Sequence, residues 1–265
     1  MVTHVLTQYE HHVAQMLWEG EDRGSLKVIT HGLKLKKFTE IPMSDPVEHW
    51  IREFGLLHLS SAYLTMADAG LRFTFVERWH RETSSFHLSF GDMTITLDNV
   101  TNLLHISSHD RCRDYLWGTA PLVFLYDNLG DGVVHDTRQL GGYMTLLQCW
   151  IYEHFPKICK WGDRGAVPAH LPRACRWTEE HVVEGRLMTY RRRLDALLLE
   201  DVVFTPYDDD RANHLFVSIS IFSGYLQCGG VLVPYLSERC LRQFGRIQCI
   251  PHDVPLMPNS IDWMW

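Results

Sequence analysis

Histidine and cysteine are the residue types in this sequence with the clearest capacity for chemistry. The chain has 265 residues, among them 16 His and 7 Cys, and both side chains are common zinc ligands. The sequence has neither a Cys-x-x-Cys pair nor a His-Glu-x-x-His motif, and Cys149, His154 and Cys159 are five residues apart. Residues at that spacing fall on different faces of a helix. We therefore expect structural or solvent-exposed histidines and no metal site.

Three consecutive carboxylates, Asp208, Asp209 and Asp210, follow Pro206-Tyr207. Oxygen ligands of this kind can bind a divalent cation. The run lacks the glycine and the distal glutamate of a calcium-binding loop, whereas aspartates are typical of turns and of the starts of helices. The pattern favours a solvated turn over a cation site.

Motifs for nucleophilic, phosphate-binding or cofactor chemistry are absent from the sequence. It has no Gly-x-Ser-x-Gly elbow, no Gly-x-x-x-x-Gly-Lys-Ser/Thr loop and no Gly-x-Gly-x-x-Gly motif. The six lysines lie only within residues 27–37 and beside Pro156, so no lysine follows a predicted strand as a Schiff-base lysine would. We predict no catalytic residue, no cofactor and a protein that is not an enzyme.

Arginine is the prominent charged residue, because 19 of the 25 basic side chains are Arg. Three stand together on a predicted helix as Arg191, Arg192 and Arg193, and Arg239 and Arg242 stand close together near the end of the chain. Such groups can contact phosphates or a protein partner. The formal charge of −7 and the nearby carboxylates favour a salt-bridged face over a nucleic-acid surface. We treat these five arginines as a weak candidate interaction surface.

Hydrophobic periodicity indicates a mainly helical protein at the margin of the α+β class. The spacing of apolar residues predicts a set of helices separated by glycine- and proline-rich breaks. They cover residues 9–18, 45–54, 62–69, 71–79, 98–104, 116–125, 143–154, 186–199 and 237–244. Asp45 as the cap, with Pro46 in the first turn, marks one start, Thr96 or Asp98 marks another, and Pro156 marks an end.

A small β-hairpin is predicted near residues 85–97, where runs rich in Phe, Ile and Thr flank Phe90-Gly91-Asp92. Alternation at Val217, Ile219 and Ile221 allows one further strand, with a helix as the alternative. We expect an N-terminal arm over residues 1–44, a single multi-helix domain over 45–250 and an irregular Pro-rich tail over 251–265.

The composition is that of a packed protein, with 46% hydrophobic and 12% aromatic residues. The sequence shows no basic-then-apolar leader and no apolar stretch near the 20 residues that span a bilayer. An odd number of irregularly spaced cysteines is untypical of a disulfide framework. We therefore expect an intracellular protein from a reducing compartment.

Several motifs in a fixed order resemble the plant mobile domain, a family that includes MAIN-like proteins, domains labelled "aminotransferase-like", transposon-associated copies and phosphatase long-form homologues. They are ERWHRET at 77–83, FHL at 86–88, GDMTITLDNV at 91–100, WGTA at 117–120, GGYMTLLQCWIYEHFP at 141–156, YRRRLD at 190–195, TPYD at 205–208 and SERCLRQFG at 237–245. The resemblance extends over about residues 4–255.

The resemblance implies a binding or scaffolding module in the nucleus that acts in meristem maintenance, gene expression and transposon silencing. The implied partner is a phosphatase-like protein or another mobile-domain protein. A nucleic-acid-binding module derived from a transposable element and a decayed, non-functional copy remain as alternatives. Within the motifs, large aromatics at helical spacing are typical of cores, so we expect Trp79, Trp150, Phe244 and Arg78 to be structural anchors.

The sequence departs from the family pattern between His105 and Trp117. Members of the family have some tens of residues there, including an apolar helical stretch, where this chain has only ISSHDRCRDYL. We therefore expect a domain shortened around residues 106–115. Milder departures are Phe204, where tryptophan is common, and Ser237, where proline is common.

Overall fold

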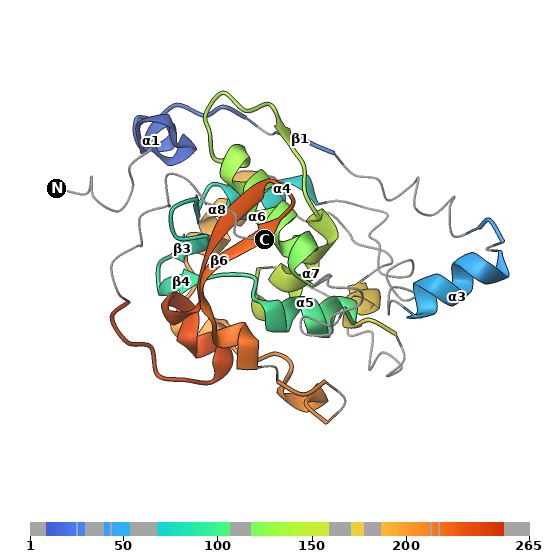
Figure 1. Cartoon of the computed structure of the whole chain (residues 1–265). Helices are drawn as coiled ribbons and strands as arrows, with labels where there is room; N and C mark the ends of the chain where they lie inside the picture. Colours follow the sequence, from blue (N-terminus) through green and yellow to red (C-terminus); the bar gives the residue numbers. More distant parts are fainter. Residues whose placement is uncertain are drawn as a thin grey trace.

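The fold is described by a computed structural model of the chain (Figure 1). The described residues are 9–24, 26–29, 40–42, 44–53, 68–106, 118–158, 171–177, 187–212, 214–216 and 218–251. Helices dominate, accompanied by small sheets, so the predicted mainly α class with minor β structure is confirmed.

The helical elements are of two kinds, α-helices and short 3-10 helices. The α-helices are α1 (Val13–Trp18), α3 (Asp45–Glu53), α4 (Ala69–Val76), α5 (Leu97–Leu104), α6 (Thr119–Gly132), α7 (Met144–His154) and α8 (Leu187–Asp195). The 3-10 helices are η1 (Tyr9–His11), η3 (Arg173–Trp177), η4 (Leu199–Asp201), η5 (Asp208–Asp210), η6 (Ser218–Ile221) and η7 (Ser237–Phe244).

The strands form three small sheets. They are β1 (Lys27–Val28), β2 (Trp79–His80), β3 (Ser85–Leu88), β4 (Gly91–Met93), β5 (Gln139–Leu140), β6 (Ser223–Cys228) and β7 (Val231–Leu236). β1 pairs in parallel with β5, β2–β3–β4 form an antiparallel sheet, and β6 and β7 form an antiparallel hairpin. That hairpin packs against α6, over which it passes in Figure 1.

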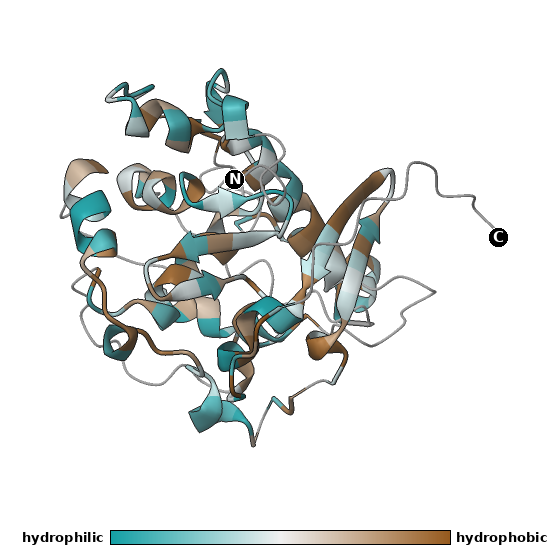
Figure 2. Ribbon diagram, turned by 90° about the vertical axis from the view of Figure 1, so that its left-hand side faces the viewer, coloured by the Kyte–Doolittle hydropathy of each residue, from teal (hydrophilic) through white to brown (hydrophobic). Residues whose placement is uncertain are grey.

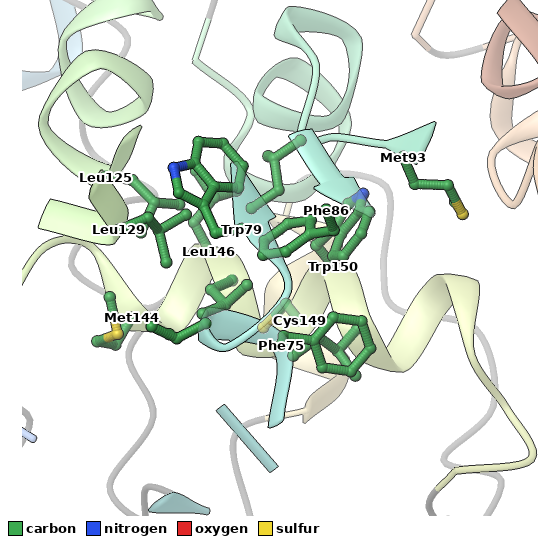
Figure 3. Packing of buried hydrophobic residues seen from close by; sticks show 14 of the residues in the cluster. Phe75, Trp79, Phe86, Met93, Leu125, Leu129, Met144, Leu146, Cys149 and Trp150 are labelled. Carbon is green, nitrogen blue, oxygen red and sulfur yellow. The ribbon is translucent and has the colours of Figure 1, made fainter. Parts of the chain in front are cut away.

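Two almost fully buried helices form the centre of the molecule. All residues of α4 from Leu71 onward and all residues of α7 except Thr145 are buried. Figure 2 shows hydrophobic and hydrophilic residues alternating along other helices, as expected for elements that bury one face. Figure 3 shows the packing of buried side chains in the core, among them the aromatic rings of Phe75, Trp79, Phe86 and Trp150.

The aromatic cluster is built around Trp150 of α7. Its ring lies 5.1 Å from Phe86 of β3, nearly parallel, and 6.0 Å from Phe75 of α4, nearly perpendicular. Trp79 of β2 lies 4.8 Å from Phe86 and 4.9 Å from Tyr126 of α6. Offset and edge-to-face arrangements of this kind add to the free energy gained from burial. Trp79 and Trp150 are fully buried and are therefore core anchors, although Trp79 lies in a strand and not at the helical spacing from which this was predicted.

The other two predicted anchors have different surroundings. Arg78 is partly buried, donates to the carbonyl of Thr74 and pairs with Asp195 at 2.5 Å. Phe244 is only half-buried and packs against Phe216 at 5.8 Å, outside the main core. The expectation of a core position for Phe244 is wrong, because Phe244 is the last residue of η7, which ends at the left-handed cap Gly245, and its ring lies outside the buried cluster.

Residue Thr96 decides where α5 begins. Its hydroxyl accepts from the backbone N–H of Asn99, and the side-chain amide oxygen of Asn99 accepts from the backbone N–H of Thr96. This reciprocal pair is a capping box, which satisfies two otherwise unpaired donors at the start of the helix. Of the two predicted caps, Thr96 is the cap, and Asp98 lies inside the helix and pairs with Arg211.

Replacing Thr96 by valine removes the capping hydroxyl without changing the side-chain volume greatly. We expect a loss of about 1–2 kcal/mol in the free energy of unfolding, because a buried N–H loses its acceptor. Chemical denaturation measures this loss. The matched control is Thr189→Val on the exposed side of α8, with an expected change within about 0.5 kcal/mol. Equal effects of the two substitutions would contradict the capping role.

Several predicted elements differ from those observed. Trp79, placed in a helix, belongs to β2. Of the two alternatives that the sequence allows around Ile219 and Ile221, a strand or a helix, the structure has the helix, as the 3-10 helix η6. The first hairpin turns at Ser89-Phe90, earlier than predicted. The β6–β7 hairpin was not predicted, although Gly229-Gly230 between alternating residues is a turn signal, and Gly229 adopts φ +57°. Residues 62–67 of the predicted helix at 62–69 and the tail beyond residue 251 lie outside the described residues, and Asp68 and Ala69 belong to the start of α4.

The N-terminal segment 9–24 is packed on the body, although the sequence suggests a loosely organised arm. Val13 is fully buried, its N–H donates to the carbonyl of Val133, and the N–H of His135 donates to the carbonyl of His11. α3 begins as predicted, but Val47 and Trp50 on its apolar face are exposed.

Candidate interaction surface

Helix α8 carries Arg191, Arg192 and Arg193, and the packing of one face of the helix determines which of the three is exposed. Tyr190 and Leu194 are buried against α4, where Gly70 permits close approach of the two helices. The hydroxyl of Tyr190 donates to Asp68 at 2.5 Å. Asp68 in turn caps α4 by accepting from the N–H of Leu71.

Arg191 lies inside the protein between two carboxylates. Its guanidinium contacts Glu77 at 2.8 and 2.5 Å and Asp22 at 2.7 and 3.2 Å. The side chains of Arg191 and Glu77 are only 11% and 3% exposed. The hydrogen bond to Glu77 raises the pKa of Arg191, and the hydrogen bond from Arg191 lowers the pKa of Asp22. Arg191 therefore joins the N-terminal segment to α4 and α8 and does not lie on the predicted surface.

Arg193 and the end of α8 are also held by internal contacts. Arg193 donates to the carbonyl of Ile158, just after α7, at 2.8 Å. Asp195 at the end of the helix pairs with Arg78. These two contacts connect α8 to the end of α7 and to Arg78.

The two arginines of η7 hold that helix to the β3–β4 turn. Arg239 contacts Asp92 at 2.9 Å, and Arg242 donates to the carbonyl of Phe90 at 2.9 Å while lying over the ring of Phe204. Burial opposes ionisation of Asp92, but its hydrogen bonds to His87 and Arg239 give it a lowered pKa. These two arginines are half-buried and lie on a different element from α8.

Arg192 differs from the other four because it faces solvent. Its guanidinium makes no ion pair or hydrogen bond within the described part of the chain. Three exposed apolar side chains occur close to it in the sequence, namely Met188 one turn before it and Leu198 and Leu199 just after the helix. The helical period predicts Leu198 on the buried side of the helix, but α8 ends at Asp195 and the period no longer applies. We call these four residues the α8–η4 surface.

The composition of the α8–η4 surface is suited to protein contact. Methionine and arginine are enriched in protein interfaces, and a flexible thioether adapts to a partner. The sequence indicated Arg192 but not Met188, Leu198 or Leu199. Their exposure depends on where α8 ends, which the apolar pattern alone does not specify.

Polar groups considered for chemistry take structural positions. Asp209 pairs with Arg173, and Asp208 lies 3.9 Å from Arg211. Buried His154 lies 2.7 Å from the carbonyl of Val203, and burial lowers its pKa to about 3. Within the described ranges, no group of three or more His, Cys, Asp or Glu residues is placed to hold a metal ion.

Comparison with protein families gives a match to the plant mobile domain over residues 54–109 and 102–262. MAIN-LIKE 2 of Arabidopsis thaliana is 24% identical over 364 residues, covering 94% of this chain and 52% of that protein. MAINTENANCE OF MERISTEMS of the same plant is 23% identical over 374 residues, covering 97% and 73%. The chain thus spans about half the length of the first relative.

A further relative matches the chain over a shorter stretch. The serine/threonine-protein phosphatase 7 long form homolog of Arabidopsis thaliana is 35% identical over 97 residues, which are 37% of this chain and 7% of that protein. No solved structure matches the chain. Among the helices of the described ranges, none has the length and apolar character needed to cross a membrane.

Proposed function

The chain belongs to the plant mobile domain family, and on that premise we propose that it is a non-enzymatic, nuclear protein-interaction domain. Its proposed setting is meristem maintenance, together with the gene expression and transposon silencing that the family resemblance implies. The relatives named MAIN-LIKE 2 and MAINTENANCE OF MERISTEMS support the developmental role. The proposed partner is a phosphatase-like protein or another mobile-domain protein.

The contacts that the arginines make within the chain are the main support for protein contact as the function. Arg191, Arg193, Arg239 and Arg242 contact carboxylates or carbonyls of the same chain, so their charge is directed inward. A nucleic-acid surface needs several unpaired cations along one face. Arg192 and its apolar neighbours instead resemble the mixed chemistry of a protein interface, where a few residues dominate binding.

Affinity purification from plant nuclei, with nuclease treatment and mass spectrometry, tests this proposal. We expect a stoichiometric protein partner that survives nuclease and that is lost in Arg192→Glu and Met188→Glu variants. Matched controls are Arg138→Glu, at another exposed arginine, and Ile247→Glu, at another exposed apolar residue. Retention of the partner by both α8 variants would contradict the proposed surface, and absence of any protein partner would contradict the function.

Nucleic-acid binding by a transposon-derived module is the second candidate, favoured only by exposed arginines such as Arg192 and Arg246. Binding of a mixed-sequence DNA duplex and a single-stranded RNA, followed between about 50 and 200 mM salt, tests it. Binding that weakens steeply over that range, roughly in proportion to the phosphates contacted, would support this candidate. We expect weak binding, because the net charge is negative.

The shortened middle of the domain is also part of the proposal. The two stretches of the family match overlap at residues 102–109, at the predicted site of shortening. The alignments with the two relatives run over 364 and 374 residues, although this chain has only 265. Both observations support the loss of a segment after α5. The buried core on either side supports a folded domain over a decayed copy.

A further inference from the structure

Three imidazole rings form a stack that joins the N-terminal segment to the body of the protein. His12, between η1 and α1, meets His80 of β2 edge to face, with ring centroids 5.8 Å apart. His80 lies nearly parallel to His87 of β3, at 5.1 Å. The proposed protein-binding function uses none of these rings.

Hydrogen bonds fix the protonation state of His12. Its Nδ1 accepts from the backbone N–H of Ala14 in the first turn of α1. Its Nε2 lies 2.9 Å from the carbonyl oxygen of Trp79. Because a carbonyl can only accept, Nε2 carries the proton and Nδ1 does not. A second proton on Nδ1 would face the N–H of Ala14 and would break the cap of α1.

The N-terminal segment is also held by the buried side chain of Val13, by backbone hydrogen bonds and by the Asp22–Arg191 ion pair. In addition, Arg23 donates to the carbonyl of Val134 at 2.8 Å. A shallow pocket opens at this seam, lined by residues that include Tyr9, His11, Arg81 and Glu82. Solvent thus approaches the buried imidazole of His12 from this side. The stack therefore lies where the packing between segment and body is open to proton exchange.

Burial and the charged groups around the rings shift the pKa values of the individual rings to different extents. Burial lowers the pKa of His12 and is the largest effect on it. Glu82 raises this pKa and Arg23 lowers it, both to smaller extents. Burial lowers the pKa of His80 to about 4, helped by His87, His12 and Arg239 and opposed by Asp92.

His87 is the ring of the stack that accepts a proton most readily. The hydrogen bond to Asp92 raises the pKa of His87, while burial and Arg239 lower it. A charge on His87 disfavours a second charge on His80, the ring stacked against it.

We propose that His12, supported by His80, is a proton-sensitive latch that holds segment 9–24 on the body while both rings are neutral. Both rings have lowered pKa values when the segment is docked on the body. The two neutral rings therefore stabilise the docked segment fully above pH 6.5, the ordinary pKa of histidine, and this stabilisation declines as the pH falls towards 4. His87 has the opposite sign, because its raised pKa favours the folded state at lower pH. Its bond to Asp92 lies within the β3–β4 hairpin, so it does not hold the segment.

Hydrogen exchange of the full chain, measured by mass spectrometry and corrected for the intrinsic effect of pH, tests the latch. The protection of residues 9–24 should fall at least about tenfold between pH 7.5 and 5.0, because burial lowers the pKa of His12 and lowers that of His80 to about 4, and both rings gain protons more readily once the segment is released. The protection of α7 should stay constant and shows that the core remains folded. Unchanged protection of residues 9–24 would overturn the proposal.

Two variants separate the latch from a general effect of acid. His80→Phe keeps an aromatic ring in the stack, and His12→Asn keeps an acceptor for the cap of α1; each removes one proton site. In both, the fall in protection should shrink to about threefold or less. His49→Phe on exposed α3 is the control and should keep the full fall. A full fall in both stack variants, with α7 still protected, would also overturn the latch.

Discussion

Replacing Arg191 by alanine should lower the free energy of unfolding by about 3–5 kcal/mol, one of the largest losses expected for a single substitution in this chain. The substitution leaves the buried carboxylate of Glu77 without its partner, and Asp22 loses its contact to α8. An uncompensated buried charge costs far more than the net value of the ion pair itself. Urea denaturation followed by circular dichroism measures the loss.

The neighbouring residue is the matched control for this prediction. Arg192→Ala removes an exposed guanidinium from the same helix and should change stability by no more than about 0.5 kcal/mol. The double variant Arg191→Met with Glu77→Leu should recover much of the loss, because no buried charge remains. Equal stabilities of the Arg191→Ala and Arg192→Ala variants would contradict the buried network. The sequence places all three arginines of the run 191–193 on the candidate surface, whereas Arg191 is buried in the structure.

Replacing Trp150 by alanine should cost about 3–5 kcal/mol, because it opens a cavity among the rings of Phe75, Phe86 and Phe155. α7 passes through the centre of the core and brings these rings together from α4, β3 and its own C-terminal end. The surrounding side chains belong to different elements, so collapse around the cavity would disturb several contacts at once. The midpoint and slope of a urea unfolding curve measure this effect.

Trp18 provides the control for Trp150 within the same protein. It is 88% exposed at the end of α1, so Trp18→Ala should leave the free energy of unfolding within about 0.5 kcal/mol of the parent chain. Similar losses for the two tryptophans would mean that Trp150 is not central to the core.

Local signals in the sequence account for much of the secondary structure. Pro156 and the helical period before it predict α7 closely, and the sequence Ser44-Asp45-Pro46 predicts the start of α3. The same rules failed where an element is short. Trp79 continues the apolar period of α4, but the chain leaves the helix after Val76 and enters β2.

The contacts that define the candidate surface depend on residues far apart in the chain. Arg191 is 114 residues from Glu77 and 169 from Asp22, and no local pattern connects them. Without those carboxylates, three adjacent arginines look equivalent. In the structure one is buried, one is bound to a carbonyl and one is exposed, because successive residues of a helix point about 100° apart.

The mass of the particle that contains this chain in plant nuclear extract tests the central claim most directly. Sedimentation of the tagged chain through a glycerol gradient, before and after nuclease treatment, gives this mass. A protein-interaction domain should migrate in a particle clearly heavier than the 30.9 kDa chain, and nuclease should not change its position. Migration as a free monomer, or a shift to the monomer position after nuclease, would contradict the account.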